Sequence, residues 1–65
     1  MKDYSSKEIL EILYKDGWQV KNVEGSHYQL THPVKSGKVT VPHPKKSVPK
    51  RTAMSIFKQA GLRLP

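Results

Sequence analysis

The first cluster of apolar residues lies between residues 9 and 13 and follows the spacing of one helix face, with Lys7, Glu8, Glu11 and Lys15 toward water. The apolar face consists of Ile9, Leu10, Ile12 and Leu13. Ser5 and Glu8 stand just before it with the spacing of a capping box, which marks a helix start. Gly17 follows Asp16 and suits the left-handed residue that ends a helix. The pattern predicts a helix over residues 6–15.

Three short stretches then show the alternation of apolar and polar residues that is typical of half-buried strands. They cover residues 18–23, 27–32 and 38–41, and Gly-containing turns separate them. Pro42 ends the third stretch because a proline cannot donate a hydrogen bond to a sheet. We expect an antiparallel meander. Trp18 opens the first strand; a core position is favoured over the alternative, a stacking platform for a base.

A second helical face follows a proline-containing loop at residues 42–49. Its apolar positions recur at i, i+3, i+4 and i+7 and are Ala53, Ile56, Phe57 and Ala60. The helix is expected to begin between residues 49 and 52 and to end at Gly61, with Leu62 folding back on it. Because prolines restrict the backbone, we expect the loop to be ordered.

These elements predict one domain over residues 1–65, of α+β class and α-β-β-β-α order. An antiparallel sheet with one buried face must pack both helices on that face. The order is that of the double-stranded RNA-binding fold, with a three-stranded sheet. Alternation leaves His27, Gln29, Lys38 and Thr40 on the open face.

Charge is distributed unevenly along the chain, whose net charge is +7. All five acidic residues lie within the first 24 positions, beside four lysines. No acidic residue follows Glu24, whereas eight basic residues do: Lys35, Lys38, Lys45, Lys46, Lys50, Arg51, Lys58 and Arg63. An electric field of uniform positive sign attracts polyanions. Nucleic acid is the first candidate ligand, and an acidic protein is the second. The alternative is a basic surface without a ligand.

Several classes of site find no support in the composition. The chain has no cysteine, so it can form neither a disulfide nor a thiolate site. His27, His32 and His43 lack the paired spacing of a zinc site, and we expect neither metal nor cofactor. No apolar run approaches the ~20 residues of a membrane span. With no signal-peptide pattern at the N-terminus, we expect a cytoplasmic protein without a membrane partner.

His27 is the residue whose chemistry remains to be explained. It follows the turn formed by Gly25 and Ser26, and it begins a strand in which Tyr28 and Leu30 face the core. Alternation therefore places its imidazole on the face away from the core, where it is positioned yet in contact with water. On this stretch alone, a surface histidine without a function is the simpler interpretation.

An ordered set of motifs argues against the interpretation of His27 as a surface histidine without a function. They are Asp16-Gly17-Trp18, Gly25-Ser26-His27, His32-Pro33, Val39-Thr40-Val41-Pro42-His43-Pro44, Pro49-Lys50 and Lys58-Gln59-Ala60-Gly61-Leu62. Together they span nearly the whole chain, which resembles the HicA (YcfA-like) toxins, the RNA-cleaving halves of toxin–antitoxin pairs. Two positions depart from the family pattern. Tyr28 stands where a second histidine is common, and Ala53 stands where a larger aliphatic residue is common.

The resemblance implies an mRNA interferase whose catalytic residue is His27. The chemistry agrees, because an imidazole can accept the 2′-hydroxyl proton at neutral pH without a metal. Lys38, Lys45, Lys46 and Lys50 are the expected phosphate contacts, and the amides of Gly25 and Ser26 are weaker candidates. The expected substrate is single-stranded mRNA, cut slowly and with weak sequence preference. The resemblance also implies a cognate HicB-like antitoxin, acidic at the interface, through which alone DNA would be bound.

Two other functions remain open at this level. One is a module of the same fold that binds RNA without cleaving it, and the other is an accessory protein whose basic face binds only protein. The general acid that protonates the leaving oxygen is also open. His43 is a candidate, but a structural role between its two flanking prolines is favoured, as it is for His32 before Pro33.

Overall fold

The computed structural model describes residues 3–62. Arg63, one of the eight basic residues after Glu24, lies outside that range. The order of elements is the predicted α-β-β-β-α. The bounds are α1 Ser6–Lys15, β1 Gln19–Glu24, β2 His27–Thr31, β3 Val39–Pro42 and α2 Lys50–Gln59. Each predicted strand is recovered within one residue at either end, and the predicted first helix has the observed bounds.

Helix α1 begins and ends as its sequence predicts. The Ser5 hydroxyl accepts a hydrogen bond from the Glu8 amide, and the Glu8 carboxylate accepts one from the Ser5 amide. At the other end Gly17 has a φ of +104°, and the amides of Gly17 and Trp18 donate to the carbonyls of Tyr14 and Leu13. This is a Schellman ending, which supplies partners for carbonyls that the helix itself leaves open.

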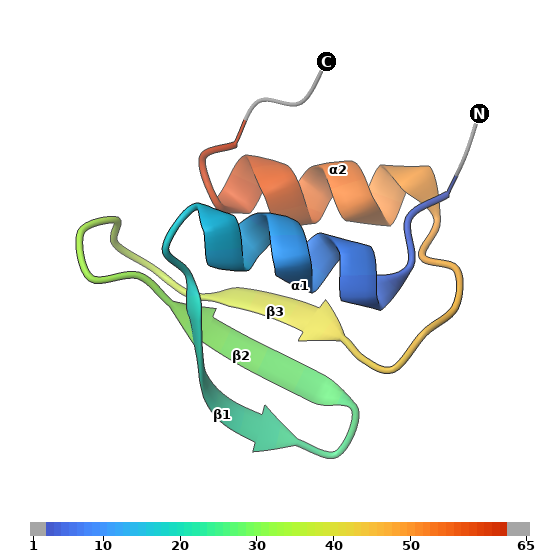
Figure 1. Cartoon of the computed structure of the whole chain (residues 1–65), viewed down its shortest axis with the longest axis horizontal. Coiled ribbons are helices and arrows are strands. Elements are labelled where there is room, and N and C mark those ends of the chain that lie inside the picture. Colours follow the sequence, from blue (N-terminus) through green and yellow to red (C-terminus); the bar gives the residue numbers. More distant parts are fainter. Residues whose placement is uncertain (1–2, 63–65) are drawn as a thin grey trace.

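The sheet has the order β1-β2-β3, with both pairs antiparallel (Figure 1). A two-residue turn joins β1 and β2, with Gly25 at a φ of +58° and no positive φ at Ser26. Gly at the first central position with positive φ is the pattern of a type II′ turn, whose twist suits a hairpin. In β1 the register shifts between Val20 and Asn22, so Lys21 is the extra residue of a β-bulge.

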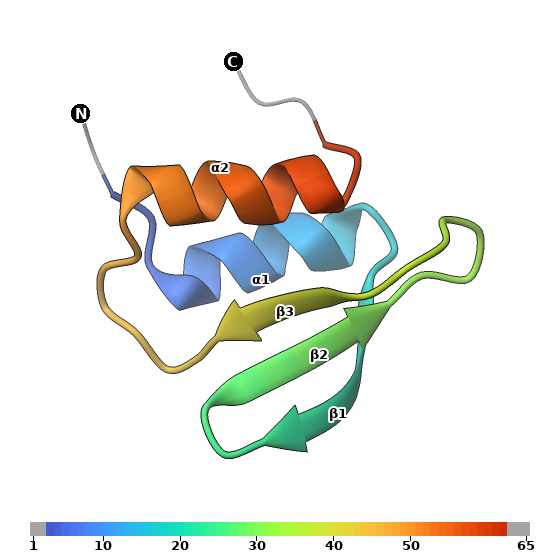
Figure 2. The ribbon, with the colours of Figure 1, turned by 180° about the vertical axis from the view of Figure 1, so that it is seen from behind.

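Both helices pack on one face of the sheet, as predicted (Figures 1 and 2). They run in the same direction and lie over β3, whereas β1 lies at the edge farthest from them. Leu30, Val39 and Val41 of the covered face are fully buried. Trp18 is also buried, with 1% of its surface exposed, which confirms the core interpretation and excludes it as an accessible stacking platform.

The loop between β3 and α2 is held to the body of the protein by its backbone, as expected of an ordered loop. The Ser6 amide donates to the Lys45 carbonyl, and the Lys45 amide donates to the Ser6 hydroxyl. The Val48 amide donates to the Tyr4 carbonyl, and Val48 is fully buried in the core. The sequence did not indicate Val48 as a core residue, since one apolar residue in a loop has no periodicity.

The C-terminal ends of the two helices are joined by residues of the loop between β2 and β3. Lys35 Nζ donates to the Asp16 carboxylate at 2.6 Å and to the Ala60 carbonyl at 3.0 Å. His32 Nε2 lies 2.7 Å from the Asp16 carbonyl, while its Nδ1 accepts from the Val34 and Lys35 amides. Lys35, one of the eight basic residues after Glu24, is thus engaged in an internal contact. His32 has the predicted structural role.

No helix within residues 3–62 is long and apolar enough to cross a membrane.

Candidate functional site

His27 is the first residue of β2 and lies on the open face of the sheet. Its backbone partners are Glu24 on β1 and Pro42 on β3. Its side chain is exposed, and within residues 3–62 its ring has no hydrogen-bond or ionic partner. The imidazole is therefore free to contact a substrate while its backbone is fixed by two neighbouring strands. The predicted placement of His27 on the face away from the core is confirmed.

His43 follows Pro42, and the alternation along the strand turns its side chain to the opposite face. Its Nδ1 lies 2.7 Å from the Ser6 hydroxyl, and its ring stands edge-on to Tyr28 at a centroid distance of 4.8 Å. Its amide donates to the Ser26 carbonyl at 2.8 Å. These contacts support the structural interpretation of His43, which holds the turn at Gly25 and Ser26 against the loop that follows β3.

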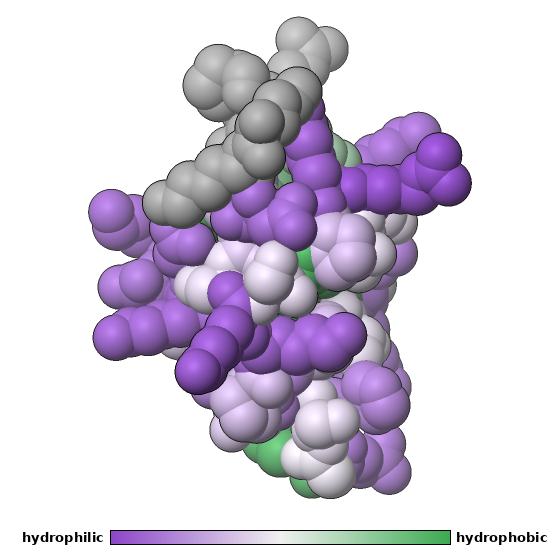
Figure 3. All heavy atoms as spheres, turned by 90° about the vertical axis from the view of Figure 1, so that its right-hand side faces the viewer, coloured by the Kyte–Doolittle hydropathy of each residue, from purple (hydrophilic) through white to green (hydrophobic). Residues whose placement is uncertain are grey.

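One end of the molecule gathers most of the predicted site residues; we call it the loop end. It consists of the β1–β2 turn, loop 43–49 and the N-terminal ends of both helices, all at the right of Figure 1. The residues found there are Gly25, Ser26, His27, Lys45, Lys46 and Lys50. Figure 3 looks onto this end and shows mainly hydrophilic side chains. The positive ends of two helix dipoles add to the lysine charges here.

A cleft of about 450 Å³ opens within the loop end, between the start of α1 and the loop. Lys7, Lys45 and Lys46 line it together with Ser5, Ser6, His43 and Pro44. Lys7 was not among the predicted contacts, because its helical spacing indicated only a solvated face. The structure adds it, since the loop folds back beside the first turn of α1.

Lys38 is separated from the other predicted lysines. It precedes β3 and lies at the far end of the sheet, where it lines a second hollow with Lys21, Asn22, Gln29 and Thr31. Four residues along β2 separate Thr31 from His27, a distance of about 13 Å at the usual rise per residue. The predicted basic contacts therefore form two groups, one at the loop end with His27 and one at the far end of the sheet.

Three residues of the open face were not among the predicted site residues. Glu24 is the cross-strand partner of His27, and its carboxylate accepts a hydrogen bond from the Gln29 side chain at 3.0 Å. The alternation that starts at Trp18 turns Lys21 to the open face, and the bulge brings Asn22 to the same face. Glu24 could have been found from the sequence, because the residues that flank a two-residue hairpin turn must pair. The bulge left no such signal.

Within residues 3–62, no three histidine, aspartate or glutamate side chains are grouped so that they could hold a metal ion.

The comparison with protein families gives one match over most of the chain. The family model of the HicA toxins, described as toxins of bacterial toxin–antitoxin systems, matches residues 6–62. This chain belongs to the HicA toxin family. The resemblance of the motifs is thereby confirmed. The matched range includes the Gly25–His27 turn and the whole of loop 43–49.

Among solved structures, this HicA toxin is similar to a chain of a toxin–antitoxin complex from Streptococcus pneumoniae. The TM-score is 0.74 at 29% sequence identity, and the match covers 89% of this chain and 97% of that chain. The comparison with curated proteins gives no match. The shared fold agrees with the predicted α+β class and double-stranded-RNA-binding-like architecture.

Proposed function

We propose that this HicA toxin is an endoribonuclease that cleaves single-stranded mRNA without a metal ion, with His27 as the catalytic general base. The observation that carries the proposal is the His27 imidazole. It is exposed, has no partner among the described residues, and begins a strand that is paired on both sides at the basic end of a HicA toxin. A surface histidine without a function would require neither the paired strand nor the basic surroundings.

The proposed step is an internal transesterification. Neutral His27 accepts the proton of a ribose 2′-hydroxyl while that oxygen attacks the adjacent phosphorus. The bond from phosphorus to the 5′-oxygen breaks, leaving a 2′,3′-cyclic phosphate on one fragment. The 5′-oxygen leaves with a proton from solvent or from protonated His27 and becomes a 5′-hydroxyl. In-line attack requires a flexible backbone, which favours a single strand over a duplex.

The lysines of the loop end supply the electrostatic part of the mechanism. Lys45, Lys46 and Lys50 attract the phosphates that flank the cut, and positive charge near the reacting phosphate stabilises its additional negative charge in the transition state. Gly25 and Ser26 are exposed beside His27, so their amides are further candidate donors. Lys38, at the far end of the sheet, would contact a more distant phosphate.

The proposed protein partner is a cognate antitoxin of the HicB kind. The similar chain from Streptococcus pneumoniae comes from a toxin–antitoxin complex. The part of the chain after Glu24 carries eight basic and no acidic residues, which favours an acidic partner surface. An antitoxin that covered the loop end would block access to His27. DNA binding would then belong to the antitoxin.

The test is cleavage of a defined messenger by the purified chain in EDTA, beside His27→Ala and His27→Gln. We expect both variants to lose about 10²–10⁴-fold in rate, the typical contribution of one acid–base group. Both should bind RNA as the wild type does, because His27 is exposed and holds no other residue in place. A substrate with a 2′-deoxyribose at the cut should resist cleavage, since it lacks the nucleophile.

The remaining outcomes separate the alternatives. If the wild type binds RNA but does not cut it, the chain is an RNA-binding module. If it binds no RNA at low salt, the basic surface serves a protein partner alone. If His27→Ala cuts as fast as the wild type, His27 is not the base. Cleavage that EDTA abolishes would contradict the proposed independence from metal.

A further inference from the structure

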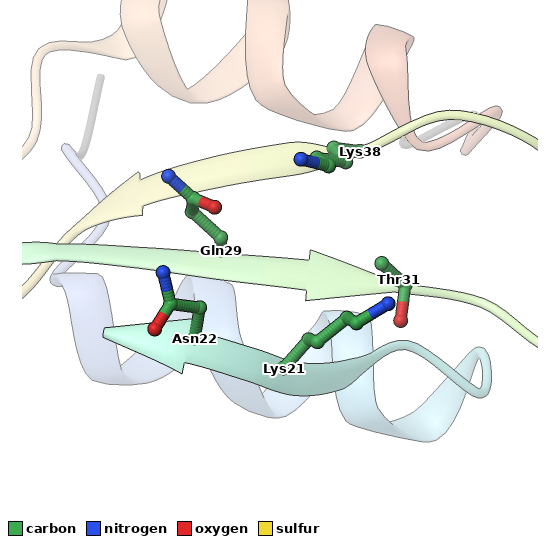
Figure 4. Close-up of a pocket in the computed structure, with 5 residues that line it drawn as sticks. All are labelled: Lys21, Asn22, Gln29, Thr31 and Lys38. Atoms are coloured by element: carbon green, nitrogen blue, oxygen red, sulfur yellow. The ribbon is translucent and has the colours of Figure 1, made fainter. Parts of the chain in front are cut away.

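The open face of the sheet holds a groove at some distance from His27. Its volume is about 320 Å³, near the lower end of the range for small-ligand sites. Its lining is polar and comes from all three strand segments: Lys21, Asn22, Gln29, Thr31 and Lys38. In Figure 4, Lys21 and Asn22 extend from β1 toward β2, and Gln29 extends from β2 toward β3, beside which Lys38 lies.

The bulge in β1 builds this groove. In a regular strand, Lys21 and Asn22 would point to opposite faces of the sheet. The register shift between Val20 and Asn22 pairs Asn22 with Gln29 and leaves Lys21 as the extra residue, so both line the open face. Bulges are common beside functional sites, where they redirect a side chain. Here the result is a cation and an amide that lie together in one hollow.

One member of the groove is already oriented. Gln29 Nε2 donates to the Glu24 carboxylate at 3.0 Å, which fixes the direction of the amide. Glu24 in turn is paired with His27 across the hairpin. The Gln29 amide is thus held by the residue opposite the catalytic histidine, and the groove and His27 share one continuous open face.

We propose that this groove binds one nucleotide of the single-stranded RNA that is cut at His27. The amides of Asn22 and Gln29 contact the edge of its base, and Lys21 and Lys38 contact the phosphates on either side. The proposal rests on the proposed ribonuclease function and adds a subsite to it. It predicts a base preference at one position, a fixed number of nucleotides from the cut, on a surface that otherwise contacts phosphate.

The composition of the groove favours RNA over a protein. Protein interfaces have apolar and aromatic centres, whereas all five lining residues here are polar or charged. Asn and Gln side chains read base edges, and lysines neutralise phosphates. The groove contains no aromatic residue, so the base would be recognised through its edge and not by stacking. An accessible base edge belongs to single-stranded RNA, because side chains cannot read the deep groove of an RNA duplex.

Binding is tested with a single-stranded RNA oligonucleotide that carries 2′-O-methyl riboses, which binds without being cut. Lys21→Ala is compared with Lys15→Ala, an exposed lysine on α1 and on the other side of the sheet. We expect Lys21→Ala to lower the slope of log K against log salt by about 0.7, the value for one phosphate contact on a single strand. Lys15→Ala should keep the wild-type slope.

Base reading is tested by cleavage of an RNA pool randomised around the cut. Asn22→Ala and Gln29→Ala should reduce the preference at one position by about fivefold or more while leaving the other positions unchanged. Asn22 is exposed, so its variant serves if Gln29→Ala is unstable by thermal melting. Lys21→Ala should slow cutting of all sequences alike at subsaturating RNA, because phosphate contacts carry no sequence information.

The two proposals fail in different ways. If the wild type cuts through His27 and the groove variants match it in slope and in base preference, the groove is not a subsite, while the ribonuclease function stands. If His27→Ala still cuts, the function fails independently of the groove. If the groove variants weaken binding of a purified antitoxin but not of RNA, the groove is a protein site and the inference is overturned.

Discussion

At the scale of single residues, the environment and not the residue type decides what each histidine does. His27 is exposed and without a partner among the described residues. His32 uses both ring nitrogens in backbone hydrogen bonds, and His43 packs between Ser6 and Tyr28. Because Nδ1 of His32 accepts hydrogen bonds from two amides, its proton is on Nε2. Of the three histidines, only His27 has neither ring nitrogen engaged with a residue of the described range 3–62.

Gly17 illustrates how close this packing is at one position. It has a φ of +104°, and a Cβ there would lie 2.8 Å from His32 Nε2. Gly17→Ala should therefore combine backbone strain with the loss of the His32 contact to the Asp16 carbonyl. We expect the free energy of unfolding to fall by about 2–4 kcal/mol, measured by urea denaturation.

Gly37→Ala is the matched control for that prediction. Its φ is +89°, yet a Cβ there would meet nothing within 4 Å. It should cost about 1 kcal/mol, the strain of a positive φ alone. Equal losses in the two variants would show that the His32 contact contributes nothing to stability.

At the scale of elements, the two parallel helices are stabilised at their ends by different means. At the loop end, backbone hydrogen bonds tie loop 43–49 to Tyr4 and Ser6. At the other end, Lys35 places one ammonium group against the C-terminal ends of both helices. A cation is favourable there because both helix dipoles are negative at that end. One lysine of the loop between β2 and β3 thus joins the ends of two helices that are far apart in the sequence.

The Lys35 contact predicts how stability depends on pH. The hydrogen bond from Lys35 and its positive charge hold the pKa of Asp16 below its ordinary value. A carboxylate whose pKa is lower in the folded state stabilises the fold above the unfolded pKa, near 3.9, and this contribution is lost as pH falls through the folded pKa. Asp16→Asn should therefore melt at a lower temperature than the wild type at pH 7.

The difference in melting temperature between the wild type and Asp16→Asn should shrink between pH 4 and pH 2, as the wild-type Asp16 carboxylate becomes protonated. Thermal melts of both proteins at several pH values measure it. Asp3→Asn is the comparison, since among residues 3–62 its carboxylate accepts one exposed hydrogen bond, from Ser47. A difference for Asp16→Asn that stayed constant down to pH 2 would contradict the role of the Asp16 charge.

At the scale of the whole molecule, the loop end is a concentrated source of positive potential. Lys7, Lys45 and Lys46 line one cleft there, and the N-terminal ends of both helices lie at the same end of the molecule. Local placement of charge should therefore affect RNA binding more than net charge does. The far end differs, because Lys35 is engaged with Asp16 and Ala60.

Two double variants with the same net charge test this. Lys45→Ala with Lys46→Ala should lower the salt slope of single-stranded RNA binding by about 1.4, the value for two phosphate contacts. Lys15→Ala with Lys58→Ala removes the same charge from exposed helix positions away from the cleft and should change the slope little. Equal losses in a fluorescence-anisotropy salt titration would mean that net charge, not the cleft, drives binding.

The sequence alone determined the elements, their order and the open face. Capping residues, the 3.6-residue and 2-residue periods, and turn glycines act between neighbours in the chain, so Ser5, Gly17, Gly25 and Gly61 could be assigned from local pattern. The same local rules placed His27 on the open face. The ordered motifs indicated the family, which the family match confirmed.

Only the tertiary structure decided which distant residues meet. The bulge at Lys21, the burial of Val48, the contact of Lys35 with both helices and the division of the lysines into two groups each depend on segments far apart in the chain. A periodic pattern describes which way a side chain points but not what lies opposite it. The physical reason is that strand register and loop packing are set by competition among non-local contacts, which leaves no signal in neighbouring residues.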